Sequence, residues 1–159
     1  MAEKIQNINI DVSSRKKFTI DGDENRVLEL NTNDMGIFSR LGDFDQTVTA
    51  AFQEFEDFQN TEMEKDDFDV VKLGEALKKL DDVIRNQFDI LYDTNFSEVV
   101  VPHGTMIDLI DGDFRFQKLN DVFSTIYEKQ FSKELKAQNE KIRKHTEKYI
   151  GKIDKTSKE

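Results

Sequence analysis

Apolar and polar residues alternate near the start of the chain, which is the two-residue period of a β-strand with one buried face. The alternation covers Ile8, Ile10 and Val12, then Phe18 and Ile20, and it is followed by Val27, Leu28 and Leu30. Residues 21–26, Asp-Gly-Asp-Glu-Asn-Arg, have turn chemistry. The pattern predicts an antiparallel sheet of two or three strands near residues 6–30. Such a small sheet needs helices to cover one face.

From residue 31 the period becomes helical. Residues 31–34, Asn-Thr-Asn-Asp, can cap a short helix with apolar positions at Met35, Ile37, Phe38 and Leu41, and we expect Gly42 to end it. A second helix is predicted over residues 43–60. Its apolar face consists of Phe44, Val48, Ala51, Phe52, Phe55 and Phe58.

A third helix follows, with Asp66 or Asp67 as its cap. Its apolar residues recur every three or four positions, at Leu73, Leu77, Leu80, Ile84, Phe88 and Leu91, and Phe68, Val71 and Val83 widen the stripe. We expect this helix to pair with the Phe-rich helix before it. Residues 94–113 contain the only proline, Pro102, and are predicted to form a short helix, a turn and a second short helix.

A long helix is predicted from about Phe114, apolar on one side as far as Phe131, with Leu135 closing that face. After it, Lys and Glu dominate a sequence of good helical propensity. We therefore predict an α+β fold that is mostly helical, with a small N-terminal sheet packed on three to five helices. Residues 1–135 would form the globular domain, and residues 136–159 a charged tail that is helical or disordered.

Charge divides the chain into two unequal parts. Residues 1–113 carry 26 acidic and 11 basic side chains, a net charge of −15, whereas residues 114–159 carry 7 acidic and 12 basic ones, a net of +5. Such asymmetry affects steering toward partners and self-association. The total of −10 disfavours a nucleic-acid partner. The division indicates a binding or assembly protein.

The composition also restricts the chemistry. The chain has no cysteine, which excludes disulfides, thiolate nucleophiles and thiolate zinc sites. The N-terminus lacks an apolar signal region, and no apolar stretch is long enough to span a membrane, so we expect a cytosolic protein without a membrane partner.

No motif identifies a reaction. Residues 21–32 superficially match a calcium loop, but Arg26 occupies the glycine position and Thr32 the position of the bidentate acid, which favours a hairpin turn. His103 and His145 lie outside any metal-binding spacing. Clusters of acidic residues are usually solvated faces or helix starts. We therefore predict no enzyme activity, no cofactor, no metal and no small-molecule substrate.

Two groups of residues are candidates for binding protein partners. The first is aromatic: Phe52, Phe55, Phe58, Phe116, Phe123 and Phe131 have the spacing of ordinary core, yet one apolar face could remain available to a partner. The second is basic: Lys141, Arg143 and Lys144 in the tail could meet the acidic body of another copy, head to tail. A solvated helix is an equally good interpretation of that tail.

Two stretches carry a resemblance to a known class of proteins. They are Phe18-Thr19-Ile20-Asp21-Gly22-Asp23 with Arg26 to Met35, and Val101-Pro102-His103-Gly104-Thr105 with Asp111-Gly112-Asp113-Phe114 and the helix over 116–126. Over residues 15–135 the chain resembles small proteins encoded in the structural gene clusters of phages of low-GC Gram-positive bacteria. Such proteins are commonly regarded as tail assembly chaperones, which coat the helices of the tape measure protein until tail tube subunits polymerise around it.

The resemblance implies a chaperone that binds the tape measure protein, possible contacts with tail tube subunits and with other copies of itself, and a location in the cytoplasm of the bacterial host. Two alternatives stay open. One is a structural subunit of the phage head, neck or tail, which would place the protein in the virion. The other is an acidic inhibitor of a host protein, suggested by the net charge of −15 on residues 1–113.

Overall fold

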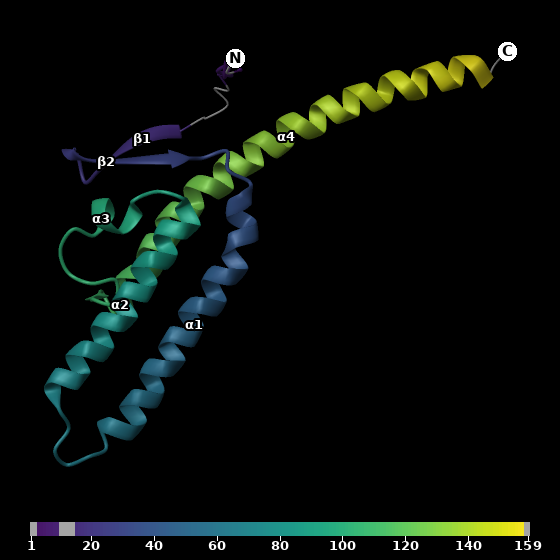
Figure 1. The fold of residues 1–159 in the computed structure, drawn as a ribbon. Helices are drawn as coiled ribbons and strands as arrows, with labels where there is room; N and C mark the ends of the chain where they lie inside the picture. Colours follow the sequence, from purple (N-terminus) through teal and green to yellow (C-terminus); the bar gives the residue numbers. More distant parts are fainter. Residues whose placement is uncertain (1–2, 10–14, 158–159) are drawn as a thin grey trace.

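Two β-hairpins and four helices make up the described residues, 3–9 and 15–157, of this computed structural model (Figure 1). The predicted α+β class is confirmed. The elements are, in order, β1 (Arg15–Ile20), β2 (Asp23–Asn31), α1 (Gly36–Glu62), α2 (Val70–Tyr92), α3 (Phe96–Val100), β3 (Leu109–Ile110), β4 (Asp113–Phe114) and α4 (Arg115–Ser157).

The hairpin of β1 and β2 confirms the predicted sheet and turn over residues 15–31. Asp21 and Gly22 form the two-residue loop, with φ angles of 53° and 73°. Positive φ at both positions is the geometry that matches the twist of a hairpin, and Asp-Gly is among the dipeptides that adopt it most readily. Leu28 and Leu30 of β2 are fully buried. Ile8 lies outside the strands, and Ile10 and Val12 lie outside the described residues.

The same tetrapeptide, Ile-Asp-Gly-Asp, closes both hairpins. Residues 20–23 connect β1 to β2, and residues 110–113 connect β3 to β4, where Asp111 and Gly112 have φ angles of 53° and 88°. In each hairpin the Ile is paired with the second Asp. The second short helix predicted within residues 94–113 is therefore wrong. The turn preference of Asp-Gly directs this segment into a hairpin that leads into α4.

The first two predicted helices are one continuous helix, α1. Gly42 does not end it, because the buried residues Ile37, Phe44 and Val48 form an unbroken face on both sides of that glycine. Tertiary packing of this face offsets the cost of a mid-helix glycine, about 1 kcal/mol. The predicted caps of α2 are also displaced: Asp69, rather than Asp66 or Asp67, accepts the hydrogen bond of the Val71 amide at 2.9 Å.

The core lies where the N-terminal hairpin and the helices α1, α2, α3 and α4 meet. Its most buried large side chains are Leu28 and Leu30 from β2, Ile84, Phe88 and Leu91 from α2, Phe96 from α3, and Val101 and Met106 from the following loop. An aromatic cluster joins three helices: the Phe96 ring lies 4.6 Å from Phe123 and 4.8 Å from Tyr92. The stripe predicted on the third helix is confirmed as core from Leu80 to Leu91. Leu73, Leu77 and Val83 are only half-buried, and Phe68 and Val71, which were expected to widen the stripe, are exposed.

Helix α4 continues past the rest of the molecule (Figure 1). Its first turns pack on the core through Phe123 and Tyr127, whereas residues 136–147 are all exposed. The helix has no break at residue 135, so the expected helical form of the tail is present as far as Ser157. The division into a domain and a tail stays a prediction.

Five arginines from five different elements donate hydrogen bonds to the backbone carbonyls of residues 91–104. The contacts are Arg15 to Asp93, Arg26 to Val99 and Val100, Arg40 to Leu91, Arg85 to Ser97, Val101 and Gly104, and Arg115 to His103. Some of these carbonyls belong to the last turns of α2 and α3, where a helix provides no further amide donors of its own. The guanidinium groups therefore supply donors that the irregular segment cannot supply itself.

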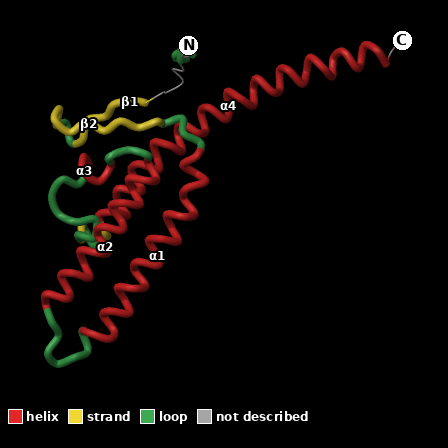
Figure 2. Tube along the Cα trace, in the orientation of Figure 1, coloured by secondary structure: helices red, strands yellow, loops and turns green. Residues whose placement is uncertain are grey.

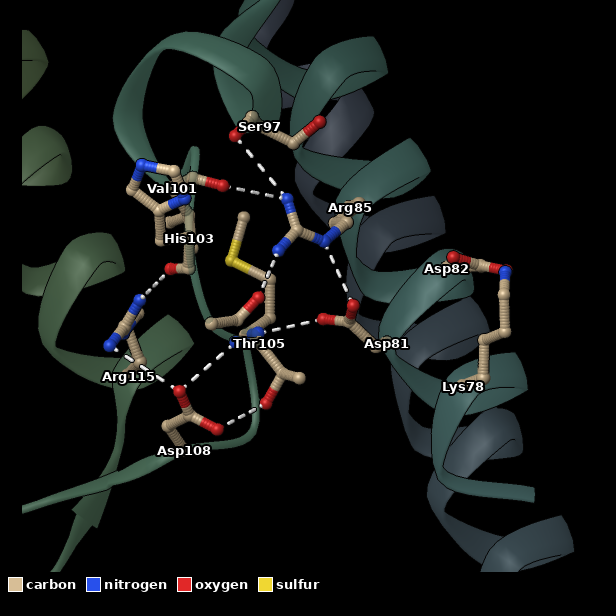
Figure 3. Close-up of polar contacts among 12 residues, drawn as sticks. Lys78, Asp81, Asp82, Arg85, Ser97, Val101, His103, Thr105, Asp108 and Arg115 are labelled. Atoms are coloured by element: carbon tan, nitrogen blue, oxygen red, sulfur yellow. Dashed lines mark hydrogen bonds and ion pairs between the residues drawn. The ribbon is translucent and has the colours of Figure 1, made fainter. Parts of the chain in front are cut away.

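Each of these arginines also pairs with an aspartate: Asp93, Asp21, Asp34, Asp81 and Asp108, respectively. Figure 3 shows the two pairs nearest the 101–108 loop. Asp81, 8 % exposed, also accepts the hydrogen bond of the Met106 amide at 2.7 Å. Thr105 donates from both its hydroxyl and its amide to Asp108, and these bonds lower the pKa of the Asp108 carboxyl.

Replacing Arg85 with Met should destabilise the protein strongly. The substitution removes the donor of Asp81 Oδ2 and of the Val101 and Gly104 carbonyls, and it leaves the Asp81 carboxylate with the Met106 amide but no opposite charge. We expect it to lower the free energy of unfolding by about 2–3 kcal/mol. Lys133→Met, at an exposed position of α4, is the control and should change the free energy of unfolding by about 0.5 kcal/mol or less. Urea unfolding measures both, and equal effects would contradict the structural role of Arg85.

The two core tyrosines should make the protein unfold in alkali. Burial raises the pKa of Tyr127 to about 12 and that of Tyr92 further, so the folded state holds both protons more tightly than the unfolded state does. The resulting stability is complete below the ordinary tyrosine pKa of about 10 and is lost as the pH rises through 12. In Tyr92→Phe/Tyr127→Phe the loss of stability between pH 10 and 12, followed by circular dichroism, should be markedly smaller. An unchanged alkaline transition would contradict this linkage.

Candidate functional site, an apolar groove between α1 and α2

Helices α1 and α2 form a hairpin that extends beyond the other elements. Helix α4 begins beside Phe52 of α1, whose ring lies 5.5 Å from Phe114 and 5.6 Å from Phe116, and then runs away from the α1–α2 loop. In Figures 1 and 2 no other described element lies over or behind the ends of α1 and α2 that are next to this loop. A third helix therefore covers the proximal half of the pair and leaves the distal half uncovered.

A groove of about 390 Å³ lies between the two helices in this uncovered region. Its apolar lining comes from Ala51, Phe55 and Phe58 of α1 and from Ala76, Leu80 and Val83 of α2. Glu54, Lys72, Glu75 and Lys79 contribute charged groups at its edges. The groove thus combines an apolar floor with a charged rim, as expected for a site that binds another helix.

Two phenylalanine rings form one wall of the groove. Phe55 and Phe58 stack with centroids 6.3 Å apart, and both are half-buried. Ion pairs join α1 to α2 at the rim, from Lys79 to Glu54 and from Lys72 to Glu62. The ion pairs connect the two helices while the apolar surface between them stays accessible.

Apolar exposure continues at the loop end of the hairpin. Met63, Phe68, Val70 and Val71 are all at least 39 % exposed. The same end is strongly acidic, because residues 54–69 carry eight acidic side chains and one basic one. Exposed apolar residues grouped beside a groove indicate an interaction surface more strongly than scattered ones do.

The structure divides the predicted aromatic residues among different environments. Phe55 and Phe58 line the groove. Phe52 and Phe116 pack on each other, and Phe131 packs on Phe38 with centroids 4.9 Å apart. Phe123 is only 6 % exposed and belongs to the core. Of the six, Phe55 and Phe58 are the ones that the structure places at a common accessible site.

The predicted basic residues Lys141, Arg143 and Lys144 are exposed on the projecting part of α4. Arg143 pairs with Glu147, one turn further along, at 3.7 Å. Figure 1 places this part of α4 and the α1–α2 loop at opposite ends of the molecule, so the structure does not bring the basic and aromatic candidates together.

Sequence reasoning missed the contribution of α2 to the groove. Leu80 and Val83 were assigned only to the apolar stripe of a core helix, and Ala76 to no role. The width of the apolar stripe on α2 could have predicted this contribution, because a helix with a broad apolar face can contact two neighbours at once.

The polar cluster of Figure 3 does not form a second site of the same kind. Asp81, Arg85, Asp108 and Arg115 direct their polar atoms at one another and at the backbone of the 101–108 loop. Within residues 3–9 and 15–157, no group of three or more His, Asp or Glu side chains is arranged to hold a metal ion. None of the helices in this described part is long and apolar enough to cross a bilayer.

Comparisons with other proteins add no relative. No family model, curated protein or solved structure matches the chain.

The groove should bind an apolar dye, and Phe58 should contribute to that binding at little cost in stability. Phe58→Ala should reduce the fluorescence of an anilinonaphthalene sulfonate probe and lower the free energy of unfolding by about 1 kcal/mol, because the ring is only half-buried. Phe123→Ala, in the core, should cost about 3–5 kcal/mol. Equal stability losses, or unchanged dye binding in Phe58→Ala, would contradict an accessible groove.

Proposed function

We propose that this protein is a phage tail assembly chaperone that binds amphipathic helices of the tape measure protein in the groove between α1 and α2. The observation that carries the proposal is the uncovered apolar groove itself. Its lining offers Phe55 and Phe58 on one side and Leu80 and Val83 on the other, where the side chains of a third helix can insert. Docking of the apolar face of a helix into such a groove is a common mode of recognition.

The rest of the molecule supports this role. The strongly charged surface opposes aggregation, because a net charge far from zero keeps proteins dispersed. The groove opens to solvent, which suits weak contacts that are repeated along a long client helix. Many weak contacts on one client gain strength by avidity. A chaperone of this kind works in the cytoplasm of the bacterial host.

The choice of the tape measure protein as client comes from the resemblance of residues 15–135 to proteins of phage structural gene clusters. The two Ile-Asp-Gly-Asp hairpins fall within the stretches that carry this resemblance. Tail tube subunits are a further client within the same proposal, because they polymerise around the tape measure protein as the chaperone leaves it.

A structural subunit of the virion is the second candidate function. The projecting part of α4 favours it, because an exposed helix of this length can reach a neighbouring subunit in a particle. Mass spectrometry of finished virions separates the two candidates. A chaperone should be absent or scarce, whereas a structural subunit should be present in a fixed ratio to the other tail proteins.

Co-expression with a tape measure fragment tests the chaperone proposal. The wild-type protein should co-purify with the fragment and increase its soluble yield, and Phe58→Glu should weaken the association at least tenfold, because it places a charge in the apolar groove. Val122→Glu is the matched control, since Val122 is 60 % exposed on α4 outside the groove lining, and it should bind normally. The proposal fails if the fragment does not associate, or if both variants bind equally well.

A further inference from the structure

We infer that the projecting part of α4 in one copy occupies the α1–α2 groove of a second copy. The inference rests on the proposed function, since it uses the same groove as a site for a helix. It names a specific occupant, residues 135–147 of another molecule of this chain.

The donor helix presents a narrow apolar ridge flanked by basic side chains. Leu135 and Ile142 are 45 % and 61 % exposed and are seven residues apart, so they lie on one face of α4. Lys141 and Arg143 adjoin Ile142 on its two sides, about 100° around the helix in each direction. Lys133 and Lys144 lie on the opposite face. A groove with an apolar floor, next to the acidic loop end of the α1–α2 hairpin, complements the first face and not the second.

The charges of the two surfaces are opposite. Residues 54–69, at the groove end of the hairpin, carry eight acidic side chains and one basic one, whereas residues 136–148 carry five basic and two acidic ones. Complementary potentials of this kind accelerate association and select the partner. The rim lysines Lys72 and Lys79 are already paired with Glu62 and Glu54, which reduces their repulsion of an incoming basic helix.

Pairing of two α4 helices with each other is a poorer solution. The contact face of such a helix pair would include Leu135 and Ile142, but also Gln138 between them and His145 one turn after Ile142. A stable two-helix seam needs apolar residues at both of its alternating positions. Two α4 helices would also bring like charges together, whereas the groove offers apolar residues and negative charge.

The fold excludes insertion of α4 into the groove of its own chain. Helix α4 is continuous from Arg115 to Ser157, and its projecting end points away from the α1–α2 loop (Figure 1). The donor and the groove therefore belong to different surfaces of the molecule. A head-to-tail contact between unlike surfaces leaves one free donor and one free groove in each pair, so further copies can add to form rings or open chains. A client helix would compete with α4 for the groove, so that self-association and client binding exclude each other.

Light scattering at several protein concentrations tests the inference on the full-length chain. In 50 mM salt the weight-average mass of the wild-type protein should rise with concentration beyond that of a dimer, and in 500 mM salt it should fall toward 18.6 kDa, because salt screens the opposed charges. Lys141→Glu/Arg143→Glu and Phe58→Glu should each remain monomeric. Lys133→Glu/Lys144→Glu, with the same change in net charge on the opposite face, should assemble like the wild type.

Mixing the two monomeric variants is the decisive measurement. Lys141→Glu/Arg143→Glu keeps an intact groove and Phe58→Glu keeps an intact donor helix, so an equimolar mixture should form a dimer and nothing larger. A mixture that stays monomeric, a wild-type protein that is monomeric in 50 mM salt, or equal effects of the two double charge reversals would overturn the inference.

The same variants separate this inference from the proposed function. Lys141→Glu/Arg143→Glu should bind the tape measure fragment at least as well as the wild type does, because its groove is no longer occupied. Client binding without self-association in the wild type would overturn only the inference. Self-association that depends on Phe58 without any client binding would overturn only the chaperone proposal.

Discussion

The fold depends on satisfying the backbone carbonyls of one irregular segment, residues 91–104. This segment connects the end of α2 to the second hairpin and passes between β2 and α4, where it contributes the buried side chains of Phe96, Val100 and Val101. Its carbonyls face guanidinium groups from β1, β2, α1, α2 and the start of α4. Since an unpaired carbonyl is costly where it is shielded from water, the part-buried bonds from Arg26, Arg40 and Arg85 hold β2, α1 and α2 against the segment.

The groove exists because α4 does not extend along the whole length of the α1–α2 hairpin. Helices α1 and α2 are long enough to form a hairpin that extends past the core, while α4 starts only at Arg115 and leaves in the opposite direction. The second hairpin determines that starting point, because its turn at Asp111 and Gly112 leads directly into α4. The uncovered apolar surface on α1 and α2 and the exposed length of α4 are thus two results of the same offset.

The sequence predicted the elements that have a regular apolar period or a strong turn dipeptide. The stripe from Leu73 to Leu91 identified α2, and the Asp21-Gly22 dipeptide identified the first hairpin. The failures have local causes. Gly42 was expected to end a helix, but burial on both sides of it prevailed over its low propensity, and the Asp111-Gly112 turn was not recognised as a copy of the first. Phe58 and Phe123 both have the spacing of core residues. The starting point of α4, which periodicity does not specify, leaves Phe58 half-buried in an open groove and buries Phe123.

The length of α4 also affects how the protein behaves in solution. A continuous helix of 43 residues is about 65 Å long, well beyond the roughly 40 Å diameter expected of a compact domain with 159 residues. The molecule should therefore tumble slowly and elute early in gel filtration even as a single chain. An early elution volume therefore does not distinguish an elongated single chain from an assembly, whereas the frictional ratio, measured with the mass, separates shape from association.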